Sequence, residues 1–346
     1  MIKKIYNGNY ASACFFRSTV EPPNMKIMLQ VTERCNLRCA HCFANAENSG
    51  NELNIELIRN LIIPNFLENS VRKVTLTGGE PMLHKDIKEI ILAFLDNKIG
   101  VSVCTNGTLI DKQFIKELTK YNNIHFNVSL DGFSKESHGK FRGNMSQIQF
   151  DKLLNNICLL GKSNLLNGIL TTPNRYATIE EYIELCKFAI NSKAKYVLMN
   201  PLSPFGRGNV VENLAYSRDE LIELKERTKA FITKNFEIVY IRFPNVDGLS
   251  ISKCAMGLIP YVFCNGDIAI CPYMVFASES NTNGYNSKDF ILGNIFDKID
   301  IKELIQQYRL PHQLQPNNQC ETDNCGCYAI KISKNQCLTD FDFDML

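Results

Sequence analysis

The chain has 346 residues, of which 14 are cysteine, and its formal net charge is +2. Hydrophobic residues make up 45% and charged residues 21%, so the length predicts two globular domains or one large α/β barrel with an appendage. The near-neutral charge excludes nucleic acid as a bulk partner, because phosphate binding needs a surplus of lysine and arginine. With no membrane-spanning apolar run and no signal peptide in the sequence, we expect a cytoplasmic protein. Disulfides are rare in that compartment, so the cysteines need another explanation.

Strand and helix signals alternate from residue 26 to about residue 200. The pattern predicts strands at 26–31, 73–77, 101–104, 125–130, 168–172 and 195–199. Helices are expected between them, at 56–67, 85–97, 111–121, 146–160 and 179–192, and a further helix is expected to start at Ser217, which forms a capping box with Glu220. This rhythm is typical of βα units on a parallel sheet. Six units fall short of the eight of a closed barrel, so the predicted fold class is α/β, a partial (β/α)6 TIM-like barrel.

The character of the sequence changes after residue 243. Helical periodicity fades, and the segment 261–271 predicts a hairpin in which Asn265-Gly266 would form a two-residue type I′ turn. We therefore divide the chain into an N-terminal extension at 1–25, a barrel at 26–243 and a cysteine-rich domain at 250–340. The extension is expected to be too short for a fused peptide-recognition domain.

The cysteines gather at two places. Three lie within eight residues, at Cys35, Cys39 and Cys42, and seven lie after residue 253. Most of the others fit buried apolar patterns and need no metal role, namely Cys104, Cys158 and Cys186, while Cys14 is not assigned. Clustered thiols in a reducing compartment indicate metal or iron–sulfur ligation.

The first cluster has the spacing CX3CX2C and directly follows the first predicted strand. Loops after strands form the reactive face of a βα barrel. Three thiolates on one loop can ligate three irons of a [4Fe–4S] cube and leave the fourth iron open. Zinc is the alternative, but it would require a fourth ligand, and His41 between two of the cysteines would be poorly directed.

This motif resembles the signature of the radical S-adenosylmethionine (SAM) superfamily. Three further landmarks at successive strand ends extend the resemblance over about residues 26–210, and they are Thr77-Gly78-Gly79-Glu80-Pro81, Thr105-Asn106-Gly107-Thr108 and Ser129-Leu130-Asp131-Gly132. The resemblance implies that the open iron chelates SAM, and that an electron from the cluster cleaves SAM into methionine and a 5′-deoxyadenosyl radical, which abstracts a hydrogen atom from the substrate.

Several polar residues are candidates for holding SAM. The backbone of Gly78 and Gly79 and the carboxylate of Glu80 could accept hydrogen bonds from its ammonium group. Other candidates suit ribose hydroxyls or a carboxylate, and they are Thr105, Asn106, Ser129, Asp131 and Arg142. For Arg142 the alternative is a surface salt bridge, and for Asp131 it is a turn cap. His138, which follows the last landmark, is expected to have a structural role.

The second group of cysteines resembles the auxiliary iron–sulfur domains called SPASM and twitch. The candidate ligands are Cys254, Cys264, Cys271, Cys320, Cys325, Cys327 and Cys337. Leu292-Gly293-Asn294-Ile295 and Pro204-Phe205-Gly206-Arg207-Gly208 extend this likeness. Asn317 stands where the family pattern has a cysteine, and seven ligands cannot fill two [4Fe–4S] clusters, so one and two auxiliary clusters both remain open. For Cys264 the alternative is that it only flanks the hairpin.

The resemblance implies modification of a ribosomally made peptide or protein by crosslinking, epimerisation or side-chain oxidation. It also implies an electron donor such as flavodoxin or ferredoxin. Two alternative functions stay open. One is modification of a small molecule or cofactor precursor such as a tetrapyrrole or a sugar, and the other is a non-catalytic role as an iron–sulfur electron carrier or scaffold.

Overall fold

The chain folds around one curved sheet of ten strands, in the order β10-β9-β8-β1-β2-β3-β4-β5-β6-β7. The computed structural model describes residues 20, 23–244, 257–279, 285–308 and 328–333. The seven neighbouring parallel strands are β1 (Met25–Thr32), β2 (Val71–Gly78), β3 (Gly100–Thr105), β4 (Ile124–Ser129), β5 (Leu166–Thr171), β6 (Tyr196–Met199) and β7 (Glu237–Tyr240). Because the strands run in chain order with β1 and β7 not paired to each other, the sheet forms an open, partial barrel.

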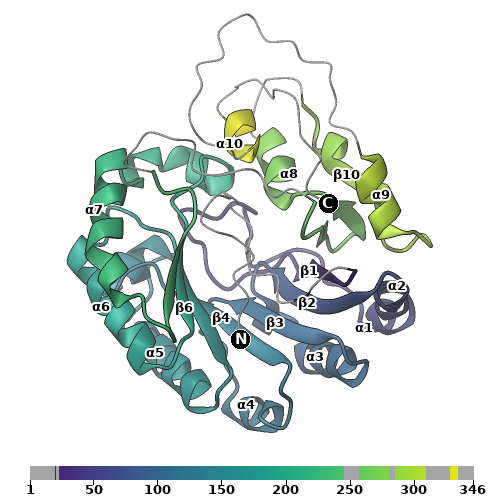
Figure 1. The fold of residues 1–346 in the computed structure, drawn as a ribbon, viewed down its shortest axis with the longest axis horizontal. Helices are drawn as coiled ribbons and strands as arrows, with labels where there is room; N and C mark the ends of the chain where they lie inside the picture. Colours follow the sequence, from purple (N-terminus) through teal and green to yellow (C-terminus); the bar gives the residue numbers. More distant parts are fainter. Residues whose placement is uncertain (1–19, 21–22, 245–256, 280–284, 309–327, 334–346) are drawn as a thin grey trace, which may run out of the picture.

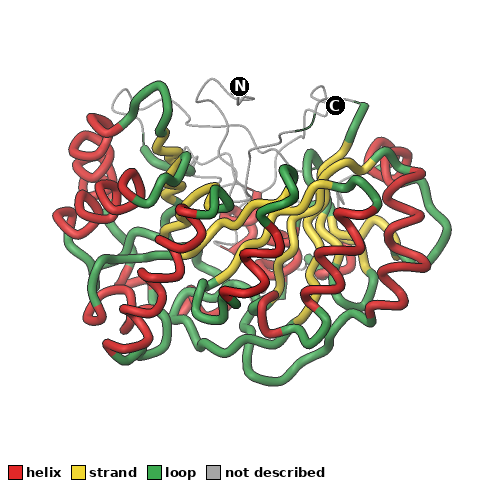
Figure 2. Tube along the Cα trace, turned by 90° about the horizontal axis from the view of Figure 1, so that it is seen from below, coloured by secondary structure: helices red, strands yellow, loops and turns green. Residues whose placement is uncertain are grey.

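Helices cover the outer face of this sheet (Figures 1 and 2). They are α1 (Ile55–Leu57), the π-helix η1 (Ile58–Ile62), α2 (Ile63–Glu68), α3 (Ile87–Asp96), α4 (Lys112–Leu118), α5 (Gln147–Lys162), α6 (Ile179–Asn191) and α7 (Arg218–Thr228). Alternate strand residues such as Ile27, Leu29 and Val31 are fully buried against the helices, as the period-two pattern of a strand requires. Ser217 caps α7 and forms the expected capping box with Glu220.

Short irregular helices lie in the connections between the strands: η2 (Pro81–Leu83), η3 (Lys135–Gly139), η4 (Gly206–Val210), η5 (Glu212–Leu214) and η6 (Lys229–Phe231). The partial barrel therefore agrees with the predicted fold class, and β7 adds a seventh parallel strand that the sequence pattern did not reveal.

The tail continues the same sheet beyond β1. Strands β8 (Tyr261–Val262), β9 (Asp267–Ala269) and β10 (Ile291–Asn294) follow, and β8 runs parallel to β1. The other tail elements are α8 (Pro272–Ser278), η7 (Ser287–Phe290), α9 (Ile301–Gln307) and α10 (Tyr328–Ser333), and they gather beside this end of the sheet (Figure 1). Asn69 of the barrel accepts a 2.7 Å hydrogen bond from the N–H of Ile301, so side chain to backbone contacts also fix α9 to the barrel.

The predicted hairpin is present, but its predicted turn type is wrong. The N–H of Gly266 donates to the carbonyl of Phe263 at 3.0 Å, and Gly266 has a φ of +88°. Asn265 does not share the positive φ that a type I′ turn needs at both central residues. The connection therefore has four residues, 263–266, with the glycine in the left-handed conformation at its end.

No helix among the described residues is long and apolar enough to cross a membrane.

Candidate active site

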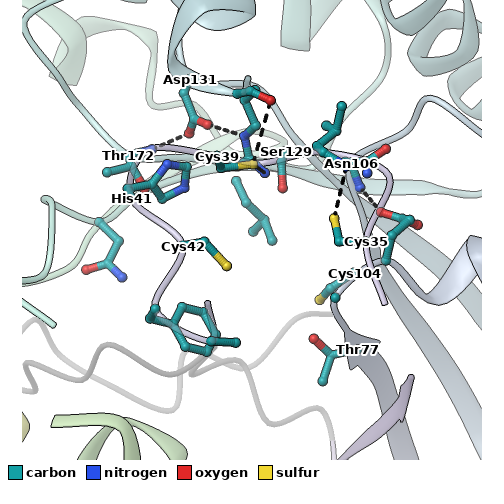
Figure 3. A pocket seen from close by; sticks show the side chains of 18 of the residues that line it. Cys35, Cys39, His41, Cys42, Thr77, Cys104, Asn106, Ser129, Asp131 and Thr172 are labelled. Atoms are coloured by element: carbon teal, nitrogen blue, oxygen red, sulfur yellow. Dashed lines mark hydrogen bonds and ion pairs between the residues drawn. The ribbon is translucent and has the colours of Figure 1, made fainter. Parts of the chain in front are cut away.

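A cavity opens at the carboxyl ends of the parallel strands, where the loops after successive strands meet (Figure 3). The predicted site residues that line it are Cys35, Cys39, Cys42, Gly78, Gly79, Glu80, Thr105, Asn106, Ser129, Asp131 and Arg142. The structure thus brings together every predicted SAM contact and all three cysteines of the first motif.

The three thiols reach this cavity from one loop, and Cys35 and Cys39 are 9% and 7% exposed. Burial raises the pKa of the Cys35 thiol to about 11 and that of Cys39 to about 12. Buried thiols become thiolates when a bound cation offsets the lost hydration, as iron does. Among the described residues, no three histidine, cysteine or acidic side chains are arranged to hold a single metal ion. A four-iron cube takes one thiolate on each of three irons, so these thiols fit it better than they fit mononuclear zinc.

Glycines of the second strand end hold the cysteine loop in place. The N–H of Gly79 donates to the carbonyl of Thr32 at 2.8 Å, and the N–H of Glu80 donates to that of Arg34 at 2.8 Å. A Cβ atom on Gly78 would lie 2.1 Å from the Thr32 oxygen, and one on Gly79 would lie 2.2 Å from the Arg34 oxygen. We expected these glycines to admit a ligand. The structure shows that they also admit the backbone that enters the cysteine loop.

Glu80 is 1% exposed and already engaged within the protein. Its Oε1 accepts from the Thr105 hydroxyl at 2.6 Å and from the N–H of Met82 at 3.0 Å, and its Oε2 accepts from the N–H of Asn106 at 2.6 Å. Burial raises the pKa of this carboxyl group, although these donors counter the effect. The geometry assigns Glu80 a role in joining the ends of β2 and β3.

The segment after the fourth strand supports the cysteine loop from another side. The N–H of Ala40 donates to the carbonyl of Phe141 at 2.9 Å, and the His41 ring stacks on the Phe141 ring with centroids 4.3 Å apart. Gly143 has a φ of +103°, and a Cβ there would lie 3.1 Å from the backbone nitrogen of Arg38. Burial lowers the pKa of His41 to about 3, so this ring is neutral where it stacks.

A third support comes from the motif after β6. Arg207 donates from Nε to the carbonyl of Cys39 at 2.9 Å and from Nη2 to that of Ala46 at 3.0 Å. Its N–H donates to the carbonyl of Cys42 at 3.0 Å. Gly206 has a φ of +57°, and a Cβ there would lie 2.4 Å from the carbonyl oxygen of Phe43. This motif, which we associated with auxiliary-cluster domains, therefore holds the first cysteine loop directly.

Asp131 and Arg142 form a buried ion pair at the cavity wall. Nε of Arg142 lies 2.5 Å from Oδ2 of Asp131, and Nη1 lies 3.8 Å from the Cys39 sulfur (Figure 3). Oδ1 of Asp131 accepts from the N–H of Thr172 at 2.7 Å. Burial alone would raise the pKa of Asp131, but the Arg142 guanidinium together with the neighbouring His41 and His138 outweighs burial and holds that pKa below its usual range. Because the pair is buried, it is not the surface salt bridge considered above, and Asp131 has more than a turn-capping role.

The remaining polar candidates differ in their freedom to bind a ligand. Asn106 donates from Nδ2 to Asn36 at 2.9 Å and accepts from the Thr108 hydroxyl at 2.7 Å. The Thr105 hydroxyl is bound to Glu80. Ser129 lines the cavity, and its hydroxyl has no hydrogen-bond partner among the described residues. His138 lies behind the wall, fully buried, and its Nδ1 accepts from the N–H of Asp131 at 2.9 Å, in agreement with a structural role.

The cavity also has lining residues that sequence reasoning missed. They are Leu37, His41, Phe43, Ala44, Thr77, Cys104, Leu170, Thr171, Thr172, Leu198, Asn200, Pro201, Ser203 and Tyr273. Most of them follow or end a parallel strand, so the rule that strand ends face the site would have indicated Thr172 and Asn200. Cys104, which we placed in the core, lies on the cavity wall. Tyr273 comes from α8, so the tail contributes to the same cavity.

Of the tail cysteines, only Cys264 and Cys271 lie in the described part of the chain. The Cys264 thiol donates to the carbonyl of Gln30 at 3.1 Å, and its N–H donates to Oε1 of that residue at 3.1 Å. Cys264 belongs to the barrel core, whereas Cys271 packs at the margin of the tail core. This placement favours a structural thiol at Cys264, and its role as a ligand stays a prediction. The other candidates lie outside the described residues: Cys254, Cys320, Cys325, Cys327 and Cys337.

Comparisons with known proteins agree with this geometry. Residues 29–189 match the family model described as the radical SAM superfamily. The chain is 29% identical over 216 residues to Fe-coproporphyrin III synthase of Methanosarcina barkeri, covering 61% of this chain and 53% of that protein. It is 25% identical over 330 residues to AlbA, the antilisterial bacteriocin subtilosin biosynthesis protein of Bacillus subtilis, covering 91% of this chain and 69% of that protein.

A solved structure is similar over most of the chain. SuiB of Streptococcus suis, bound to its precursor peptide SuiA, superposes with a TM-score of 0.65 at 21% identity. The match covers 91% of this chain and 72% of SuiB. At that identity the likeness shows the fold alone.

Proposed function

Because the chain belongs to the radical SAM superfamily, we propose that it cleaves SAM reductively and uses the 5′-deoxyadenosyl radical to modify a ribosomally made peptide or protein. The observation that carries the proposal is the meeting of three cysteine thiols and the strand-end polar groups in one cavity. In this proposal Cys35, Cys39 and Cys42 hold a [4Fe–4S] cluster. That cluster supplies the electron and an open iron for SAM.

The residues around the cysteines orient and enclose the reactants. Ser129, with an uncommitted hydroxyl, donates to a carboxylate or ribose oxygen of SAM. Arg142, held by Asp131 through Nε, offers its remaining N–H groups to the SAM carboxylate. Leu170, Leu198 and Tyr273 supply an apolar wall that keeps water from the radical.

The test of the enzyme class is anaerobic incubation with SAM and dithionite. We expect 5′-deoxyadenosine from the wild-type protein and none from the Cys35→Ala/Cys39→Ala/Cys42→Ala variant. The tail iron should remain in that variant, because its ligands lie elsewhere in the sequence. No product above blank from the wild type would leave the non-catalytic electron carrier as the better account.

A peptide substrate is supported by two comparisons. The likeness to AlbA spans 91% of the chain, and SuiB shares the fold with a precursor peptide bound. The test is co-expression of the protein with each short open reading frame beside its gene, followed by mass spectrometry. A mass change in the peptide that disappears with the triple cysteine variant supports the proposal.

The second candidate is a small molecule or cofactor precursor such as a tetrapyrrole. It is favoured by the 29% identity to Fe-coproporphyrin III synthase, although the chain spans about half the length of that relative. Unchanged peptides together with conversion of a porphyrin added to the same reaction would favour it.

We also propose one or two auxiliary [4Fe–4S] clusters in the tail, an electron donor such as flavodoxin or ferredoxin, and a cytoplasmic location. Two auxiliary clusters predict about twelve irons per chain in total, and one predicts about eight. Iron analysis of the anaerobically purified protein distinguishes these numbers.

A further inference from the structure

A second hollow lies outside the active-site cavity, between the cysteine loop and the tail. This groove has a volume of about 520 Å³. It is lined by residues of β1, of the cysteine loop and the segment after it, of the hairpin, of α8 and of the segment 287–291. Its named lining residues are Gln30, Glu33, Ala44, Asn45, Ala46, Glu47, Ser49, Phe263, Asn265, Asp267, Val275, Phe276, Glu279, Ser287, Lys288 and Ile291.

The groove carries charge of the sign opposite to that of the whole chain. Four acidic residues line it, Glu33, Glu47, Asp267 and Glu279, against the single cation of Lys288, while the chain as a whole is +2. Of these four acidic residues, only Glu47 forms an ion pair with a described residue, and its carboxylate lies 3.6 Å from Arg38 at an exposed site. The carboxylates of Glu33 and Asp267 accept hydrogen bonds from neutral amides only.

Two aromatic rings and the side-chain amide of Gln30 add an apolar surface and a hydrogen-bond donor to the groove. Phe263 and Phe276 are half-buried and meet edge to face with centroids 5.7 Å apart. Gln30 is 4% exposed, and its Oε1 accepts from the N–H of Cys264, which orients the amide. The side-chain nitrogen of Gln30 has no hydrogen-bond partner among the described residues, although the residue lines the groove.

These features fit a peptide better than a metal ion. No three acidic side chains in the described part of the chain are arranged to hold one cation. Separated carboxylates beside aromatic rings instead match a segment with several basic and apolar side chains, and the Gln30 amide can donate to its backbone carbonyl.

We propose that the groove docks a basic, apolar segment of the peptide substrate, outside the cavity where the reaction occurs. The inference rests on the proposed function, because it assumes a peptide substrate. In this proposal one segment of the peptide binds the groove, and a different residue of the peptide is modified in the cavity. Docking would then contribute affinity and selection at a place that shares only Ala44 with the lining of the active-site cavity.

The test measures binding by fluorescence anisotropy, without SAM or reductant. The probe is a fluorescein-labelled octapeptide, Gly-Lys-Phe-Gly-Lys-Phe-Gly-Lys, and the control peptide has glutamate in place of each lysine. The variant is Glu33→Gln/Glu279→Gln, in which the glutamine at 33 retains an oxygen acceptor for Asn51. The matched control is Glu68→Gln/Glu117→Gln, which removes two exposed acids on α2 and α4.

Exposed charge pairs contribute about 0.2–1 kcal/mol each, so the groove variant, which removes two charges, should bind the lysine probe roughly two- to 30-fold more weakly than wild type. The control variant should bind it like wild type, and the glutamate peptide should bind weakly to all three proteins. Equal affinity in the two variants would overturn the proposal. Tighter probe binding after deletion of residues 1–19 would also overturn the proposal. It would show that this segment, which carries three cations and no acid, occupies the groove in place of the substrate.

The two proposals fail separately. Anisotropy reports docking without catalysis, whereas the peptide mass change reports catalysis. A modified peptide with equal probe binding in the variants would refute the docking site alone.

Discussion

Arg207 is the most direct test of how the cysteine loop is held. Replacing it by methionine keeps the length of the side chain but removes the donors to the carbonyls of Cys39 and Ala46, at 2.9 and 3.0 Å. Hydrogen bonds from charged groups contribute about 1.5–3 kcal/mol each, and water replaces part of this at a partly buried site. We therefore expect the substitution to reduce the free energy that favours the closed conformation of the cysteine loop by about 2–3 kcal/mol. The loop should then open about 30- to 150-fold more often, by the relation of 1.4 kcal/mol per tenfold.

The assay follows iron release to a ferrous chelator under anaerobic conditions. The relevant phase is the one absent from the triple cysteine variant, which separates the loop cluster from the tail clusters. Arg207→Met should accelerate this phase about 30- to 150-fold. Arg72→Met is the control, because Arg72 is exposed and has no ion pair among the described residues. A wild-type rate in Arg207→Met, or equal acceleration in both variants, would refute the reasoning.

Three further substitutions test other parts of the site. Gly79→Ala places a Cβ 2.2 Å from a backbone oxygen and should reduce iron by one cluster, whereas Gly100→Ala, with 3.4 Å available, should retain it. Asp131→Asn leaves a buried arginine without its anion and should cost about 3–5 kcal/mol of unfolding free energy in denaturant titration, while Asp111→Asn at an exposed pair should cost under about 1 kcal/mol. Burial lowers the pKa of His138 to about 3, so the unfolded chain binds its proton first as the pH falls below about 6.5. His138 should then contribute a decline in stability of about 1.4 kcal/mol per pH unit as the pH falls from about 6 to about 3, in addition to the contribution of His41. His138→Gln should reduce the measured slope by about that amount, and an unchanged slope would contradict the assignment.

The sequence pattern located most elements of the barrel because strand and helix signals alternate regularly there. Predicted strands 26–31 and 101–104 appear as Met25–Thr32 and Gly100–Thr105. Two short elements were missed, whereas β6 and α4, which are equally short, were predicted from their place in the alternation. Strand Glu237–Tyr240 has four residues and contains a single fully apolar pair, and helix Pro272–Ser278 has seven residues with no polar face. Neither is long enough to show a period.

The site was predicted in position but not in its internal contacts. The residues of the strand-end motifs line one cavity, since parallel strands end at one edge of the sheet, and their roles as SAM contacts stay predictions. The partners of Glu80 and Arg207 could not be read from local sequence, because they come from residues 25 and more than 160 positions away. Spacing alone also could not show that Cys264 lies against β1.

The central claim is that Cys35, Cys39 and Cys42 together support reductive cleavage of SAM. The most direct measurement is 5′-deoxyadenosine formed per chain from SAM and dithionite under anaerobic conditions, in wild type and in the triple alanine variant. The account predicts product from the wild type, none from the variant, and retention of the tail iron in both. Product from the variant at the wild-type rate, or none from a wild-type protein carrying its full iron, would contradict it.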